Sequence, residues 1–444
     1  MMTNVGLCAL VKFLKEDFRM KKKILASLLA VAMMLSLAAC SGGGSEGGST
    51  NADGKIHLTL FNTKSEIQAA MEEMAEAYNQ SHDNVYMEIY YSNDTVAAHM
   101  ATKYASNDPY VISMVDTKDI YSLGPDHAID LSDLSFVGNT TEAVEIDGKM
   151  LGIPICVEGR GLIYNADPIE AITGEPFDPA KYATLDAFQG LIDELKAGGM
   201  ETPVGIMKED WSLAAHFLAE VYEKRPDIDG FIADLQAGNV DLMSDDMFNG
   251  LMDFFDVLKE NNYAKGSPIA AERETSEMKL AQGEIAFMYG GCWDWAVISA
   301  YDYSTNMGIM PVPENTSTNY NTMLIGAGSK YLMIDNTVSE EQQAAAKEFM
   351  EWLFATDEGN QWLTQNFAMV PAYSNISAAN LDPLGSSISE YYNSGKMFPG
   401  YNHTPDDHYS KLGAEMQKYL AGQCSREDLA KAIEAYWPTA TLAE

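Results

Sequence analysis

Basic side chains are scarce in this sequence: 28 Lys and Arg stand against 65 Asp and Glu, and the formal net charge is −37. A protein that binds nucleic acid needs clustered Lys and Arg to neutralise phosphates, and no basic patch or tail offsets the acidity here. The composition therefore argues against nucleic acid as a partner. We interpret the acidity as a surface property, because mutual repulsion keeps proteins soluble.

Cysteine and histidine are also few, with five and seven residues. Their spacings match no disulfide framework and no zinc site. We expect neither a metal nor a cofactor, and we expect Cys156, Cys292 and Cys424 to be small buried hydrophobic residues. The sequence motifs of serine hydrolases, zinc proteases and P-loop proteins are absent as well.

The N-terminus carries a targeting signal. A lysine triplet at residues 21–23 precedes an apolar run, Ile24 to Leu37, that is too short for a comfortable membrane span. The run ends in Leu-Ala-Ala before Cys40, which resembles a bacterial lipobox. By that resemblance, residues 1–39 are a signal peptide and Cys40 carries acyl chains such as palmitate. The true start is expected at Met20, and an uncleaved signal anchor is the alternative.

The remaining chain is long enough for a tethered, folded body. Residues 40–54 contain the lipidated cysteine and a Gly/Ser-rich linker that we expect to be flexible. Apolar residues make up 46% of the sequence, which allows a large core, and 444 residues are enough for two or three domains. We expect a monomer held by its lipid on the extracellular face of a bacterial cell membrane.

Strands and helices alternate from residue 55 onward. Lys55–Phe61, Val85–Tyr90 and Tyr110–Val115 have the apolar patterns of strands, and helical patterns follow the first two. This alternation predicts a parallel α/β sheet. Ligands bind such sheets beyond the carboxyl ends of the strands, and Asn62, Lys64 and Asp116 fall there.

Two sequence patterns predict helix N-termini. Thr63-x-x-Glu66 and Ser339-x-x-Gln342 both have the spacing of a capping box, in which the two side chains satisfy free backbone N–H groups. Each is followed by apolar residues at helical spacing.

Two charged residues interrupt the apolar run Gly148–Asn165. Glu158 and Arg160 lie in its middle, and charges within a buried strand need partners. Either the two form a salt bridge with each other, or they face a ligand.

The segment Glu284–Trp295, EIAFMYGGCWDW, is the strongest candidate for a binding site. It predicts a strand that breaks at Gly290-Gly291, where the backbone could take unusual angles. Trp293, Asp294 and Trp295 follow, and an indole face with a carboxylate suits the apolar face and hydroxyls of a sugar. Core packing of both indoles is the alternative, and Asp294 also fits as a helix cap. Trp295 should point away from Trp293 along a helix.

Five segments in this order resemble one family, the extracellular solute-binding proteins of ABC importers, and within it the family 1 carbohydrate binders that include maltose-binding protein. The resemblance runs from Lys55 to about Trp437. It is carried by IPICVEGRGLIYNADPIE, TLDAF, GEIAFMYGGCWDW, MGIMPVP, and EQQAAAKEFMEWLFATDEGNQWL followed by MVPAY.

The resemblance implies an α/β, two-lobed periplasmic-binding-protein-like fold. Each lobe would be a mostly parallel sheet flanked by helices, with a multi-strand hinge between the lobes and the ligand in the cleft. One lobe is expected over residues 55–155 with 311–355, and the other over 156–306 with 360–444.

The resemblance also implies roles for individual residues. Glu158 would accept hydrogen bonds from sugar hydroxyls, and Trp293 would stack on a sugar. Asp116 would be an acidic contact, although Met114 and Val115 replace an aromatic residue expected before it, which argues against maltose. Arg160 departs from the family pattern, because it replaces a small or apolar residue seen in many members, and its guanidinium could bind the carboxylate of an acidic sugar. The remaining expected contacts are Asn62, Lys64, Glu66, Trp211, Asp294 and Trp295.

The function implied is capture without chemistry. The protein would bind a sugar or oligosaccharide, close around it and deliver it to the membrane-spanning subunits of an ABC permease. One alternative is the same fold with another solute, such as a peptide, a polyamine or a metal. The other is a surface glycosidase, which in its retaining form needs two carboxyl groups about 5–5.5 Å apart.

Overall fold

A computed structural model describes residues 54–92, 94–317 and 320–442 of the 444-residue chain. The predicted signal peptide, Cys40 and all but the last residue of the predicted linker lie outside the described residues. Within the described ranges, no helix combines the length and the apolar character needed to span a bilayer.

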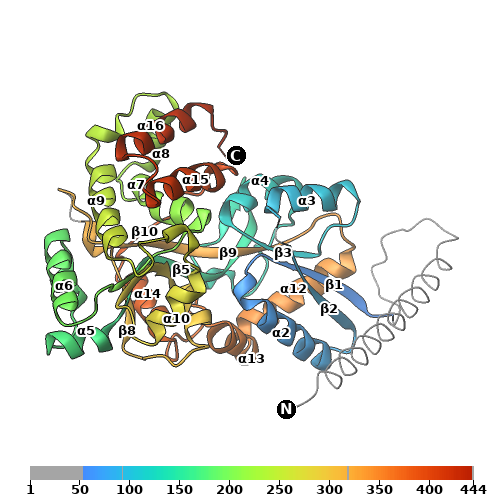
Figure 1. Cartoon of the computed structure of the whole chain (residues 1–444). Helices are drawn as coiled ribbons and strands as arrows, with labels where there is room; N and C mark the ends of the chain where they lie inside the picture. The colour runs from blue at the N-terminus through green and yellow to red at the C-terminus, as the bar shows by residue number, and fades with distance from the viewer. Residues whose placement is uncertain (1–53, 93, 318–319, 443–444) are drawn as a thin grey trace, which may run out of the picture. The chain divides into compact units, whose positions relative to one another are not determined.

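One mixed sheet of ten strands organises this part of the chain (Figure 1). The strand order is β2-β1-β3-β9-β5-β7-β6, with β10 beside β9 and with β4 and β8 beside β5. The strands are β1 (Ile56–Asn62), β2 (Val85–Tyr91), β3 (Ile112–Val115), β4 (Val144–Ile146), β5 (Lys149–Asn165), β6 (Val204–Gly205), β7 (Phe287–Gly291), β8 (Met307–Met310), β9 (Leu324–Ile334) and β10 (Met397–Phe398).

The parallel pairings lie at the two ends of the sheet. β1 is parallel to β2 and β3, and β6 is parallel to β7. The pairings between these ends, made by β5 and β9, are antiparallel, apart from the short β10. We refer below to the β1 end (β1, β2 and β3 with their helices) and the β7 end (β6, β7 and β8 with theirs).

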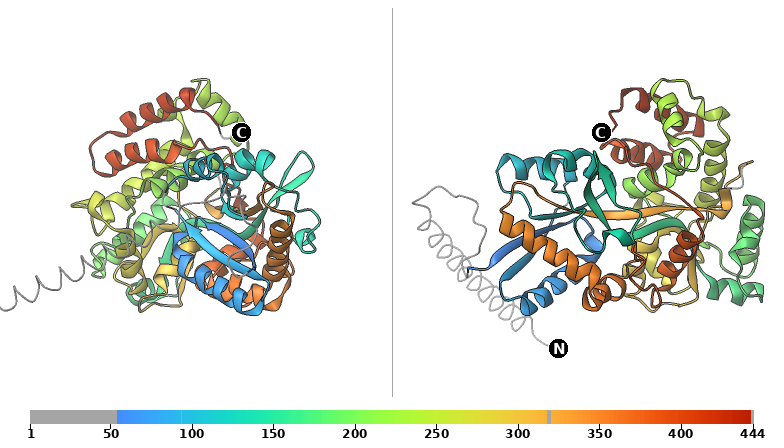
Figure 2. Two further views of the ribbon diagram at one scale, coloured as in Figure 1. Left: turned by 90° about the vertical axis from the view of Figure 1, so that its right-hand side faces the viewer. Right: turned by 180° about the vertical axis from the view of Figure 1, so that it is seen from behind.

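Helices cover both faces of the sheet. They are α2 (Gln68–Ser81), α3 (Val96–Ala105), α4 (Thr117–His127), α5 (Ala166–Thr173), α6 (Leu185–Ala197), α7 (Glu220–Glu223), α8 (Ile228–Gln236), α9 (Asp246–Asn261), α10 (Arg273–Ala281), α11 (Trp295–Ile298), α12 (Glu340–Ala355), α13 (Asp357–Gln361), α14 (Pro383–Asn393), α15 (His408–Leu420) and α16 (Arg426–Tyr436). At the β1 end, α2 and α12 lie on one face and α3 and α4 on the other (Figures 1 and 2).

The two-residue period of β1 explains this layering. Leu58 and Leu60 point into the large core shared with α2 and α12, whereas Phe61 points into the smaller core shared with α3 and α4. All three side chains are at most 1% exposed. The strands predicted over 55–61, 85–90 and 110–115 are confirmed to within two residues at their ends.

β5 connects the two ends of the sheet. Its residues Ile153 to Arg160 pair with β9, and Arg160 to Asn165 pair with β7 or β8. Most of the 17-residue strand is buried, in agreement with its apolar sequence. Glu158 and Arg160 therefore lie between the two ends of the sheet, where β5 passes from β9 to β7.

One of the two predicted capping boxes is confirmed. Ser339 and Gln342 form theirs at the start of α12. Thr63 caps no helix, because its hydroxyl donates to the Met114 carbonyl at 2.8 Å, and a short 3-10 turn precedes α2. Thr63 thus joins β1 to β3.

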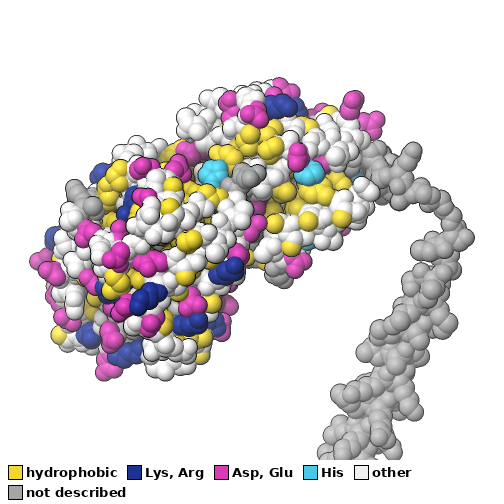
Figure 3. Space-filling view, turned by 90° about the horizontal axis from the view of Figure 1, so that it is seen from above, with side chains coloured by type: hydrophobic (Ala, Val, Ile, Leu, Met, Phe, Trp, Pro, Cys, Tyr) yellow, Lys and Arg dark blue, Asp and Glu magenta, His cyan; other side chains and the backbone are white. Residues whose placement is uncertain are grey.

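Acidic side chains are scattered across the face drawn in Figure 3, with basic side chains between them. This distribution agrees with the interpretation of the acidity as a surface property.

Candidate functional site

Both ends of the sheet line one small cavity. Lys64, Glu66 and Ile67 come from the turn after β1, and Cys292, Trp293 and Ala296 from the segment after β7. The other lining residues belong to β5 and to a loop: Cys156, Val157, Glu158, Phe367, Ala368, Met369 and Val370. The cavity volume is about 20 Å³, which is room for about one water molecule.

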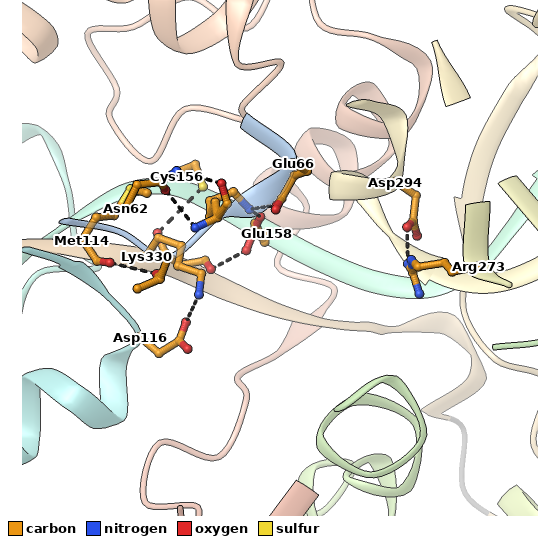
Figure 4. A network of polar contacts seen from close by, with 12 residues as sticks. Asn62, Glu66, Met114, Asp116, Cys156, Glu158, Arg273, Asp294 and Lys330 are labelled. Atoms are coloured by element: carbon orange, nitrogen blue, oxygen red, sulfur yellow. Dashed lines mark hydrogen bonds and ion pairs between the residues drawn. The ribbon is translucent and has the colours of Figure 1, made fainter. Parts of the chain in front are cut away.

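Lys64 is the hub of a charge cluster on the β1 side of the cavity, and its partners Glu66 and Glu158 are labelled in Figure 4. Its ammonium lies 2.5 Å from Glu158 and 2.7 Å from Glu66. Burial alone lowers the pKa of Lys64, but the two carboxylates outweigh it and hold that pKa well above its ordinary value. Lys64 is therefore charged, and its charge outweighs burial and lowers the pKa of Glu66.

Asn62 shapes the turn that presents Lys64. Its amide oxygen accepts from the Lys64 backbone N–H at 2.8 Å, and its amide nitrogen donates to the Lys64 carbonyl at 2.9 Å and to Gln68 at 2.8 Å. The side chain is completely buried. The geometry gives Asn62 a positioning role toward Lys64.

A second ion pair lies beside this cluster. Lys330 of β9 approaches Asp116, at the start of α4, to 2.6 Å (Figure 4). Burial raises the pKa of Asp116, but Lys330 outweighs it and holds that pKa below its ordinary value. Lys330 has a φ of 50°, a left-handed conformation that is uncommon in non-glycine residues and clusters at functional sites. Sequence reasoning missed Lys330, because its glycine-rich surroundings carry little strand signal.

Glu158 and Arg160 have different partners, so the alternative in which they form a salt bridge with each other is wrong. Besides Lys64, Glu158 accepts a hydrogen bond from Ser329 at 2.5 Å. Arg160 pairs with Glu223 of α7, and both side chains are almost buried, at 11% and 5% exposure. The buried guanidinium is thus already matched by a carboxylate.

Trp293 forms the β7 wall of the cavity, but the backbone before it differs from the prediction. β7 continues through both glycines, and Gly291 is extended, with φ −143°. The expected break at Gly290-Gly291 is wrong. The glycines provide space: a Cβ at Gly291 would lie 2.3 Å from the Trp293 ring, and one at Gly290 would lie 2.0 Å from Asp294.

Asp294 is buried, and each of its two carboxylate oxygens has a partner. Oδ2 accepts from the Gly291 N–H at 2.9 Å, and Oδ1 pairs with Arg273 of α10 (Figure 4). Arg273 also contacts Glu277 at 3.1 Å. Burial and the Asp294 carboxylate raise the pKa of Glu277 to about 9, so Glu277 is protonated at neutral pH.

Trp211 and His216 belong to a π-helix, Trp211–Leu218, and lie next to Trp293 without lining the cavity themselves. Their ring centroids are 5.2 Å apart, and His216 lies 4.8 Å from Trp293. The Arg273 guanidinium lies 4.8 Å from the centre of the Trp211 ring. Sequence reasoning missed Arg273 and His216, since neither stands in a recognisable motif.

Trp295 lies apart from the cavity lining. It is 7% exposed and its ring contacts Tyr303 at 4.9 Å. Cys156 and Cys292 are buried, as expected, and burial raises the pKa of both thiols. Cys424 is only partly buried.

A family model described as bacterial extracellular solute-binding protein matches residues 73–383. Solved structures share the fold across most of their length. The solute-binding protein RafE in complex with raffinose is 16% identical, with a TM-score of 0.73, over 86% of this chain and 99% of that one.

Two further structures give similar values. A sugar transporter protein from Bacillus licheniformis, in complex with stachyose, is 18% identical with a TM-score of 0.64, over 86% of this chain and 98% of that one. A family 1 extracellular solute-binding protein from Bifidobacterium longum subsp. infantis is 20% identical with a TM-score of 0.59, over 87% and 100%. The predicted α/β fold class is confirmed by these likenesses.

Proposed function

Since the chain belongs to the bacterial extracellular solute-binding proteins, we propose that it captures a sugar or oligosaccharide between the two ends of its sheet and delivers it to an ABC permease. One observation carries this proposal. The same cavity is lined by a charged pair from the β1 end, Lys64 and Glu66, and by an indole from the β7 end, Trp293. A ligand in this place contacts both ends at once.

Binding requires the two ends to separate and close again. A cavity of about 20 Å³ is far smaller than the roughly 300–1,000 Å³ of ordinary ligand pockets. The strands β5 and β9 connect the ends and serve as the hinge. A ligand that contacts both walls stabilises the closed state through its higher affinity for that state.

The polar groups suit hydroxyls. Glu158 and Asp116 are hydrogen-bond acceptors held close to lysines, and Lys64 is a donor. Trp293 provides a flat apolar surface for the C–H face of a sugar ring. Asp294 and Asn62 act indirectly, by holding Trp293 and Lys64 in place. Trp295 is part of the buried core.

The charges favour an uncharged ligand. Lys64, Lys330 and Arg160 each face a carboxylate, so the site has no unmatched cation for an acidic sugar among the residues described. Raffinose and stachyose, present in two structures of this fold, are uncharged oligosaccharides.

We further propose that the protein works at the outer surface of the cell without chemistry of its own. Acylation of Cys40 would hold it at the membrane, which a Cys40→Ser variant tests. This variant should leave the membrane fraction and appear in the medium. Wild-type distribution of C40S between membrane and medium would overturn the anchor.

The ligand is tested with the mature protein by isothermal titration calorimetry against neutral glycans, acidic sugars, peptides and spermidine. We expect binding of a neutral mono- or oligosaccharide. Binding of only peptides or spermidine would replace the proposed ligand class. The glycan that binds best is then incubated with the protein for a prolonged time. A binding protein leaves this glycan unchanged, whereas a glycosidase hydrolyses it.

A further inference from the structure

A π-helix brings two aromatic side chains together beside the ligand cavity. In its i→i+5 hydrogen-bonding pattern, residues five apart come close to the same face, which an α-helix would not allow. Trp211 and His216 are five apart, and their rings meet edge to face at 5.2 Å with an interplanar angle of 80°. π-Helices are rare and concentrate at functional sites.

The imidazole of His216 is close to two indoles. Its centroid is 4.8 Å from that of Trp293, which lines the cavity, and 5.2 Å from that of Trp211. The Nδ1 atom of His216 and the Nε1 atom of Trp293 are both buried, and neither has a hydrogen-bond partner within the described part of the chain. Buried polar groups are normally hydrogen-bonded, so two neighbouring exceptions need an explanation.

His216 is an uncharged imidazole at neutral pH. Burial first, and then the cations Arg160 and Arg273, hold its pKa well below the ordinary value. Lys330 and Lys64 act in the same direction. These four groups belong to β5, α10, β9 and the turn after β1, and each is paired with a carboxylate. A neutral imidazole has one donor and one acceptor nitrogen, which suits a hydroxyl.

We propose that His216 is a specificity-determining ligand contact: it forms one hydrogen bond with a hydroxyl of the sugar that stacks on Trp293. This inference rests on the proposed function. Contacts with the two indoles restrict the plane of the ring, so the imidazole can reach only a hydroxyl in one orientation. His216 thus selects between epimers of the bound sugar.

His408 provides a matched control. It is 1% exposed, both of its ring nitrogens are buried without a partner among the described residues, and it too lies among aromatic rings. Those rings belong to Tyr222, Tyr436 and Trp437, none of which lines the cavity. A His408→Phe variant therefore measures the general effect of replacing a buried imidazole.

The test uses the glycan that binds best, its single-deoxy derivatives and the variants H216F, H216Q and H408F, with affinities from calorimetry. We expect H216F to weaken binding about tenfold, H408F to leave affinity unchanged, and H216Q to recover part of the loss. One deoxy derivative should bind the wild type about tenfold more weakly than the parent sugar, yet bind H216F as tightly as the parent does.

Several outcomes would overturn the proposal. If H216F binds the parent glycan as tightly as the wild type, His216 is not a ligand contact. The same holds if each deoxy derivative loses as much affinity for H216F as for the wild type. In both cases the sugar-binding function stands. If H216F does not fold, the same affinities are measured for H216Q. The proposal then requires that the affinity losses of the deoxy derivatives differ between H216Q and the wild type. If no glycan binds the wild type, the function and this inference fail together.

Discussion

The Nζ atom of Lys64 lies 2.5 Å from the carboxylate of Glu158, although 94 positions separate them in the sequence. This pair joins the turn after β1 to the strand that leads to the β7 end. It holds a donor and an acceptor side by side at the cavity wall.

Glu158→Gln should weaken sugar binding more than it destabilises the protein. The amide keeps the shape of the side chain but loses the charge that strengthens hydrogen bonds from hydroxyls, and we expect a loss of about tenfold or more in affinity. Lys64 keeps Glu66 as a partner at 2.7 Å. Calorimetry measures the affinity and thermal unfolding the stability of E158Q, with E66Q measured in parallel. A loss of stability in E158Q without a loss of affinity would contradict the prediction.

The sequence predicted the walls of this site better than the contacts within them. Alternating apolar residues identified β1 and the strand before Trp293, although the break expected at Gly290-Gly291 was wrong. The Lys64–Glu158 pair could not be foreseen, because the pattern of one strand says nothing about which distant side chain approaches it. The first half of β9 was not predicted for another reason. Gly326, Ala327 and Gly328 have little or no side chain to pack on a sheet, so their sequence does not indicate a strand.

Glu277 should make stability depend on pH. Its pKa is raised from an ordinary 4.5 to about 9, so its protonated form stabilises the fold fully below pH 4.5. That contribution declines as the pH rises and is lost above about pH 9. Gln cannot ionise, so the melting temperature of E277Q should exceed that of the wild type by a margin that widens from pH 5 to pH 9. Parallel curves over that range would show that Glu277 is not protonated in the native state.

Arg273 should support both indoles through its charge and its flat guanidinium. Removing the charge in Arg273→Met leaves the buried Asp294 unpaired, which we expect to cost about 3–5 kcal/mol of stability. Arg273→Lys keeps the charge but cannot lie flat against Trp211. We expect R273K to fold and to bind sugar several-fold more weakly. Equal stability of R273M and R273K in chemical denaturation would contradict this account.

Gly291→Ala should displace Trp293. The new methyl group would lie 2.3 Å from the ring, so the indole must move, and stacking should weaken by about tenfold. Gly190, in α6, is the matched control because a Cβ there meets nothing within 4 Å. G190A should leave affinity unchanged and raise stability slightly, since Ala favours a helix. Unchanged affinity of G291A would show that stacking does not depend on the position of the Trp293 ring.

The contact between Gly291 and Trp293 also has an evolutionary consequence. Because the indole occupies the space of a side chain at 291, the two positions cannot drift independently. Homologues with an aromatic residue at 293 in this conformation should keep glycine at 291, and those with a larger residue at 291 should have a smaller one at 293. Selection for a different sugar would therefore replace both residues in concert.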